Sequence, residues 1–187
     1  MIDALNSGKY DLDHTALLIT QTGGGCRASN YIHLLRKALK KAGYGYIPVL
    51  SLNFSGLEKD SGLKFTLPMA RELISAVFYG DELMLLANQQ RPYETHPGET
   101  DRLVAQWVDE LLEQFASGHG YAKREMTRNF NAIAESFAQI PVVRTARVKV
   151  GVVGEIYIKY SPLGNNQLEQ FLAKEGCEVN VPGLLGF

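Results

Sequence analysis

Short apolar runs alternate with longer segments of helical periodicity along this chain of 187 residues. The strand-like runs are residues 16–20, 46–53, 147–160 and 177–181. The helix-like segments are residues 28–42, 66–90, 100–115, 121–139 and 165–174. Strands separated by helices favour a parallel sheet, because parallel strands need long crossovers and the crossover helices cover both faces. The pattern therefore predicts an α/β protein.

The predicted sheet has four parallel strands in the order 2-1-3-4. Three helix-like segments lie between the second and third strands, so we expect a helical insertion over about 66–140. Pro48 indicates that the second strand is an edge strand or begins after this residue. We find no internal repeat, and we expect residues 1–187 to form a single domain. The apolar end, "NVPGLLGF", favours a domain taken from a longer protein.

The composition is typical of a soluble globular protein, with 45% hydrophobic and 21% charged residues. The formal net charge of −1 provides no bulk attraction to nucleic acid or to an anionic membrane. No stretch approaches the ~20 apolar residues of a membrane span, and the first residues lack the pattern of a secretory signal. Two distant cysteines, Cys26 and Cys177, favour a reducing compartment over a disulfide framework. We therefore expect a cytoplasmic protein with no nucleic-acid or membrane partner.

A glycine-rich turn lies where the first strand ends and the first helix begins. Gly23, Gly24 and Gly25 allow a tight turn, and their backbone N–H groups can approach a ligand at the positive end of the helix. The turn therefore predicts an anion site, with phosphate as one candidate. The match to dinucleotide-binding motifs is incomplete, because Ala28 stands where the last glycine of G-x-G-x-x-G would lie.

Cys26 lies in the same turn, next to Arg27. A cysteine at a helix N-terminus beside an arginine has a lowered pKa and is partly thiolate. Thiolates attack electrophiles or bind metals, but none of the 4 histidines has a context that marks it as a base. Cys177 is expected near the start of the last strand, away from the carboxyl ends, so a zinc site lacks ligands. The alternative is that Cys26 is a small residue that packs beside the glycines.

A second group of candidate residues lies near the end of the predicted third strand and just after it. In an open parallel sheet, ligands bind beyond the carboxyl ends of the strands, where the strand order reverses. The order 2-1-3-4 would bring residues 21–27 near Glu155, Ser161 and Asn165. Glu155 is a candidate catalytic carboxylate, or a group satisfied by Arg27 or by backbone N–H groups. Ser161 and Asn165 are candidate cofactor-binding residues, and Asn165 is alternatively a helix cap.

Several motifs together resemble one family. They are "TQTGGGCRASNY", "LLRKALKKAGY", "IPVLSLNFSGLE", "NQQRPYE" and "VGVVGEIYIKYSPLGNNQLEQFL". They resemble the dehydratase-like part of large fused proteins known as 2-hydroxyglutaryl-CoA dehydratase activators or CoA-substrate-specific enzyme activases. That part is related to the subunits of 2-hydroxyacyl-CoA dehydratases and benzoyl-CoA reductases. The resemblance covers about residues 10–171 and does not extend to the ATPase part, whose phosphate loops have no counterpart here.

The resemblance implies a flavodoxin- or Rossmann-like three-layer fold in which loop cysteines hold a 4Fe–4S iron–sulfur cluster. The cluster would accept one electron from an ATP-dependent activase component and pass it to an acyl-CoA. Cys26 would be one metal ligand. A 4Fe–4S cluster takes about four thiolates, so the other ligands would come from other domains of the parent protein.

The isolated chain is accordingly expected to bind no cofactor and to be inactive as an enzyme. Two alternatives stay open. One is a phosphate-, nucleotide- or coenzyme A-binding module built on Gly23, Gly24, Gly25 and Arg27, without a cluster. The other is a purely structural interaction domain in which Cys26 only packs.

Overall fold

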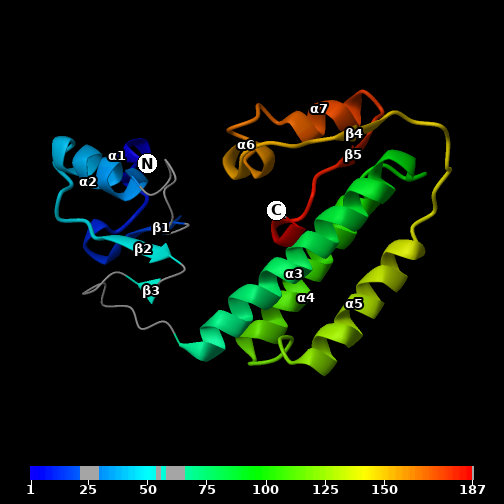
Figure 1. The fold of residues 1–187 in the computed structure, drawn as a ribbon, viewed down its shortest axis with the longest axis horizontal. Helices are drawn as coiled ribbons and strands as arrows, with labels where there is room; N and C mark the ends of the chain where they lie inside the picture. The colour runs from blue at the N-terminus through cyan, green and yellow to red at the C-terminus, as the bar shows by residue number, and fades with distance from the viewer. Residues whose placement is uncertain (22–29, 54–55, 58–65, 187) are drawn as a thin grey trace. The chain divides into compact units, whose positions relative to one another are not determined.

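A computed structural model describes residues 1–21, 30–53, 56–57 and 66–186 of the chain. The chain divides into two compact units, Met1–Leu67 and Pro68–Phe187 (Figure 1). Each unit has its own sheet and its own apolar core. Within the described ranges, no helix combines the length and the apolar character that crossing a bilayer requires.

The first unit is built on a parallel crossover. Its elements are α1 (Ile2–Asn6), η1 (Leu12–His14), β1 (Leu17–Gln21), α2 (Tyr31–Lys41), β2 (Val49–Asn53) and β3 (Gly56–Leu57). β1 and β2 pair in parallel over their whole length, with Leu17 opposite Val49, and β3 adds an antiparallel edge. Ile32 and Leu39 of α2 pack with Val49 in one buried cluster. The predicted strand–helix–strand unit is confirmed, and β2 begins just after Pro48.

The second unit starts with a bundle of long helices. Its elements are α3 (Leu67–Gln90), η3 (Arg91–Tyr93), α4 (Glu99–Ala116) and α5 (Lys123–Ala138). The buried cluster between them includes Tyr79, Leu83, Leu111, Ile133 and Phe137. The helices correspond to the helical segment predicted over about 66–140.

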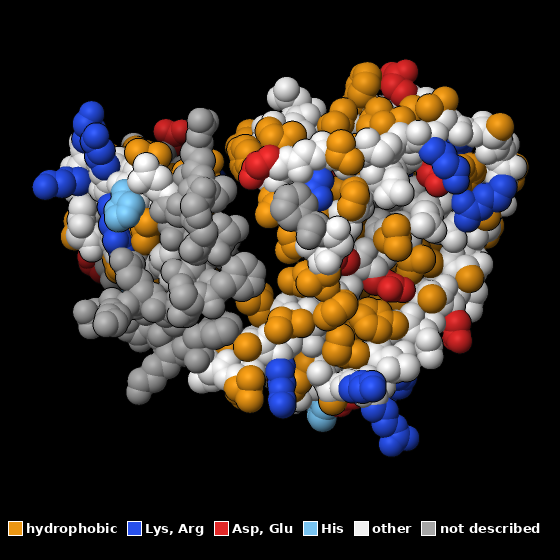
Figure 2. Space-filling model, viewed as in Figure 1, with side chains coloured by type: hydrophobic (Ala, Val, Ile, Leu, Met, Phe, Trp, Pro, Cys, Tyr) orange, Lys and Arg blue, Asp and Glu red, His pale blue; other side chains and the backbone are white. Residues whose placement is uncertain are grey.

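One side of α3 does not contribute to this core. Leu73, Ile74 and Phe78 are 48%, 54% and 45% exposed. Figure 2 shows hydrophobic side chains on this face of the bundle. The apolar residues that α3 buries in the bundle core include Tyr79, Leu83 and Ala87.

The rest of the second unit is a small parallel pair with short helices. Its elements are β4 (Lys149–Gly151), α6 (Ile156–Tyr160), α7 (Leu168–Lys174), β5 (Glu178–Asn180) and η4 (Leu184–Gly186). β4 and β5 pair in parallel, with Val150 opposite Val179. Val152, Val179 and Val181 form a buried cluster against Met84 of α3.

The predicted four-stranded sheet of order 2-1-3-4 is wrong. The parallel pairs β1–β2 and β4–β5 belong to two separate sheets, and the described chain is a mostly helical α/β structure. The third strand was expected over 147–160, but β4 ends at Gly151. Gly154 then adopts a φ of 145°, and Glu155 caps α6. A short apolar run such as "IYIKY" fits a strand or a buried helix equally well by periodicity, so tertiary packing decides between them.

Candidate functional site

The predicted glycine–cysteine turn lies outside the described residues. The structure describes the chain on either side of it, where β1 ends at Gln21 and α2 begins at Tyr31. The assignments of Gly23, Gly24, Gly25, Cys26 and Arg27 to a binding site therefore stay predictions. Because β1 and β2 are parallel and α2 connects them, the intervening residues leave β1 at its carboxyl end. That edge of an open α/β sheet is where ligands usually bind.

Ser51 is a buried polar residue in this unit that the sequence did not mark as functional. It lies opposite Ile19 in the parallel pair, two residues before the last residue of β2. Its side chain is on the same side of the strand as Val49, which packs under α2. Ser51 is 3% exposed, and its hydroxyl has no hydrogen-bond partner among the residues that the structure describes. A serine inside the apolar run "VLSL" is the signal that could have identified this group.

Glu155 acts as a local cap in the second unit. It directly precedes α6, and its carboxylate accepts a hydrogen bond of 2.9 Å from the backbone N–H of Tyr157. The residue is exposed. This geometry matches the alternative in which backbone N–H groups satisfy the carboxylate, and one carboxylate oxygen is used by the cap.

Ser161 and Asn165 organise the turn between α6 and α7. The Ser161 hydroxyl accepts a bond of 3.2 Å from the backbone N–H of Gly164. The Asn165 carbonyl oxygen accepts from the N–H of Leu168 at 3.1 Å, and its amide donates to the Ile158 carbonyl at 2.9 Å. Together with Glu155, these residues surround α6. The crevice that would join these residues to residues 21–27 was predicted from the single four-stranded sheet. Because residues 22–29 lie outside the described chain, the crevice stays a prediction.

Lys159 is a second polar residue that the sequence did not mark. It lies in α6, is 2% exposed, and its Nζ is 4.7 Å from the centre of the Tyr160 ring. Lysine is almost never fully buried unless its charge is compensated. The face of the Tyr160 ring is one group that can stabilise the buried ammonium. Tyr160 in turn donates its hydroxyl to the Pro182 carbonyl at 2.5 Å. A lysine within the apolar run "IYIKY" is the sequence signal for this arrangement.

The residues present do not fit a complete iron–sulfur cluster. The chain has 2 cysteines, whereas a 4Fe–4S cluster takes about four thiolates. Cys177 is half-buried just before β5, and its backbone N–H donates to the Leu172 carbonyl at 3.0 Å. Among the residues that the structure describes, no group of three or more His, Cys, Asp or Glu is arranged to hold a metal ion.

Comparisons with protein-family models, with curated proteins and with solved structures found no match for this chain.

Proposed function

We propose that this chain is a dehydratase-type α/β segment in which Cys26 supplies one thiolate to an iron–sulfur cluster completed by other protein. The proposal is based on the sequence resemblance and on one structural observation. β1, α2 and β2 form a parallel crossover, so the stretch that contains Cys26 follows the carboxyl end of a parallel strand. A flavodoxin-like arrangement around that crossover belongs to the same proposal.

The composition of α2 supports a thiolate at this position. The helix has no acidic residue in its first turn, and Lys40 and Lys41 lie in its last turn. The positive end of the helix dipole is therefore not neutralised by a carboxylate of the helix itself, and it can stabilise a nearby anion. Arg27, the neighbour of Cys26 in the sequence, would act in the same direction.

The remaining cluster ligands must come from other protein, because this chain supplies too few cysteines. When bound, the cluster would supply one-electron chemistry on an acyl-CoA, with the electron delivered by an ATP-dependent activase component. The contribution of this chain is then one ligand and the scaffold that holds it. We accordingly propose that the isolated chain is inactive as an enzyme. The reduced state of its two cysteines in the cytoplasm is part of the same proposal.

The ligand role can be tested on the full chain without its partners. The chain is incubated with iron, sulfide and an excess of a small thiol that can occupy the missing ligand positions. After gel filtration, wild-type protein and Cys177→Ser are expected to retain iron, whereas Cys26→Ser retains little. Without the added thiol, we expect no stoichiometric cluster on any variant. Equal iron retention by Cys26→Ser and Cys177→Ser would refute the proposal.

A second candidate is favoured by the orphan hydroxyl of Ser51. This group lies near the carboxyl end of β2, where a phosphate or a nucleotide at the start of α2 could accept its hydrogen bond. Calorimetric titration with coenzyme A and with ADP tests this candidate. Saturable heat that Ser51→Ala reduces and Cys26→Ser leaves unchanged would favour it over the cluster, and no heat at millimolar ligand would eliminate it.

A further inference from the structure

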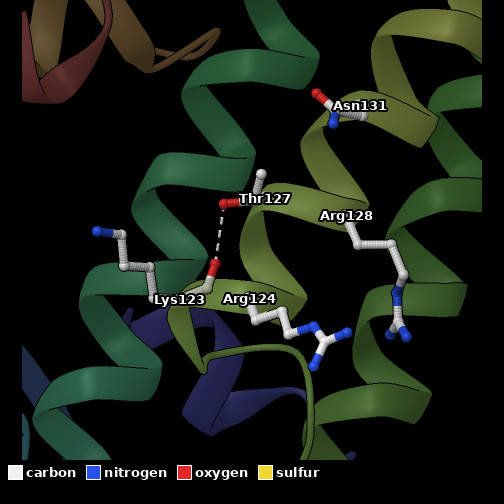
Figure 3. A pocket seen from close by; sticks show the side chains of 5 residues that line it. All are labelled: Lys123, Arg124, Thr127, Arg128 and Asn131. Carbon is white, nitrogen blue, oxygen red and sulfur yellow. Dashed lines mark hydrogen bonds between the residues drawn. The ribbon is translucent and has the colours of Figure 1, made fainter.

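The first turns of α5 form a hollow lined by three cations that the proposed function does not use. Figure 3 shows the lining residues, Lys123, Arg124, Thr127, Arg128 and Asn131. They recur at intervals of three and four residues, which places them along one side of the helix. In Figure 3, Arg124 and Arg128 extend from successive turns toward the same side, and Lys123 extends away from them.

Within the described part of the chain, no ion pair neutralises these three positive charges. The ion pairs of the described residues include Arg91 with Asp101, Arg102 with Glu99 and Lys149 with Glu178, but none with Lys123, Arg124 or Arg128. The whole chain has a formal net charge of −1, so local neutralisation would have been available from its acidic residues. Lys123, Arg124 and Arg128 thus form a cluster of positive charge within six residues of the sequence.

The one acidic side chain among these turns is directed to other partners. Glu125 accepts hydrogen bonds from the backbone N–H of Gly120 at 2.9 Å and of Ala122 at 3.2 Å. Its other oxygen is 3.1 Å from Nδ1 of His119. The backbone bond from Ala122 and the His119 contact hold the pKa of this carboxyl below its usual range. Glu125 thus caps the helix and stays ionised, but it does not pair with Arg124 or Arg128.

The arrangement of the cations works against the stability of α5. Positive side chains in the first turn face the positive end of the helix dipole, where acidic residues are favoured. Arg124 and Arg128 are also like charges four residues apart, a spacing at which they repel each other. A bound anion offsets both the unfavourable interaction with the helix dipole and the repulsion between the two arginines. Two guanidinium groups one turn apart, each able to form paired hydrogen bonds with phosphoryl oxygens, match two adjacent phosphoryl groups.

We infer that this hollow on α5 is a binding site for a diphosphate group, held by Arg124 and Arg128. Thr127 and Asn131 add polar groups on the same side of the helix. The Thr127 hydroxyl donates to the Lys123 carbonyl at 3.0 Å, which leaves its oxygen lone pairs available to water or to a ligand cation. Lys123, at the start of the helix, contributes at longer range. The site is independent of the glycine–cysteine turn, so neither proposal depends on the other.

The test is a titration of the ¹⁵N-labelled full chain with sodium pyrophosphate, followed by amide chemical shifts at constant ionic strength. We expect saturable shifts concentrated in residues 123–131 and weaker binding of inorganic phosphate. The double variant Arg124→Gln/Arg128→Gln is expected to bind about tenfold more weakly, since each exposed charge contact is worth a few-fold in affinity. Lys123→Gln should bind pyrophosphate about twofold more weakly than wild type. A parallel titration with ADP identifies the source of the group: tighter binding than pyrophosphate indicates a nucleotide, and equal binding indicates the diphosphate alone.

Arg102→Gln is the matched control, because Arg102 is an exposed arginine near the start of the neighbouring helix α4. It should leave pyrophosphate binding unchanged. The substituted residues on α5 are all exposed, so the variants should keep the amide spectrum of the folded protein. The inference is overturned if the shifts do not saturate, if sodium chloride reproduces them, or if Arg102→Gln weakens binding as much as the double variant.

Discussion

The buried hydroxyl of Tyr79 allows a quantitative test of the helical bundle. Tyr79 is 2% exposed, and its ring packs 4.9 Å from that of Phe130, measured between ring centres. Its hydroxyl donates to the Gly120 carbonyl at 2.6 Å and accepts from the Asn129 amide at 3.0 Å. The substitution Tyr79→Phe keeps the ring and removes only the hydroxyl.

We expect Tyr79→Phe to lower the free energy of unfolding of the bundle by about 2 kcal/mol. A buried hydrogen bond is worth about 1 kcal/mol net, and a buried carbonyl left without its donor costs about 1–3 kcal/mol. The Asn129 amide keeps its second bond, to the Gln114 side chain at 2.7 Å, which limits the loss. A change of about 2 kcal/mol lowers the folding equilibrium constant about 30-fold.

Urea unfolding followed by tryptophan fluorescence measures this change. The single tryptophan, Trp107, packs against the same core and donates to the Ser136 hydroxyl at 2.8 Å. Its fluorescence therefore reports on this bundle. The matched control is Tyr121→Phe, at a half-buried tyrosine whose hydroxyl has no hydrogen bond to a described residue. That control should change the stability by less than about 0.5 kcal/mol.

The loss of stability caused by Tyr79→Phe should also depend on pH. Burial raises the pKa of Tyr79 above its ordinary value. A raised pKa in the folded state means that the neutral hydroxyl contributes fully below about pH 10 and that this contribution is lost at higher pH. The difference between wild type and Tyr79→Phe should therefore narrow above about pH 10. Equal losses for Tyr79→Phe and Tyr121→Phe at pH 7 would refute the reasoning.

Three further substitutions, the first with a matched control, test core packing and two hydrogen-bonded contacts. Phe137→Ala should cost about 3–5 kcal/mol by urea unfolding, because Phe137 is 0% exposed, whereas Phe171→Ala, at 57% exposure, should cost far less. The Tyr93 hydroxyl, which donates to Glu178 at 2.6 Å, lowers the pKa of that carboxylate; Tyr93→Phe should raise this pKa in an NMR titration. The depressed pKa of Glu178 stabilises the fold above about pH 4, and this contribution is lost as the pH falls further. The difference in stability between wild type and Tyr93→Phe should therefore narrow below about pH 4. Asp81→Asn should speed amide exchange in η4, because the Asp81 carboxylate accepts from two backbone N–H groups there at 2.8 and 3.0 Å.

The long elements of this protein could be predicted from local patterns. α2, α4 and α5 follow the helical periodicity of their residues and end within a few residues of the ends predicted for the segments 28–42, 100–115 and 121–139. β1 and β2 follow apolar runs, and Pro48 marks the start of β2. These signals are local, because hydrogen bonding within a helix and the geometry of proline depend on neighbours in the sequence.

The candidate site was less predictable. The sequence motif identifies Cys26 and its glycines as candidates, and they lie outside the described residues. Glu155 is a carboxylate near the end of a predicted apolar strand, but that stretch ends in a helix that Glu155 caps. A polar residue within an apolar run is a local signal for Ser51 and Lys159, but the burial of these side chains depends on α2 and on the residues around α6, which no local pattern specifies.

The order of residues alone determined that strands and helices alternate, that a long helical segment lies between the second and third strand-like runs, and that one thiol follows three glycines. Only the tertiary structure decided that β1 and β4 belong to different sheets and that "IYIKY" forms a helix. The physical reason is the separation in sequence between the residues that interact. A helical turn or a proline stop depends on contacts a few residues apart, whereas strand pairing and the burial of a polar side chain depend on segments that meet only after the chain has folded.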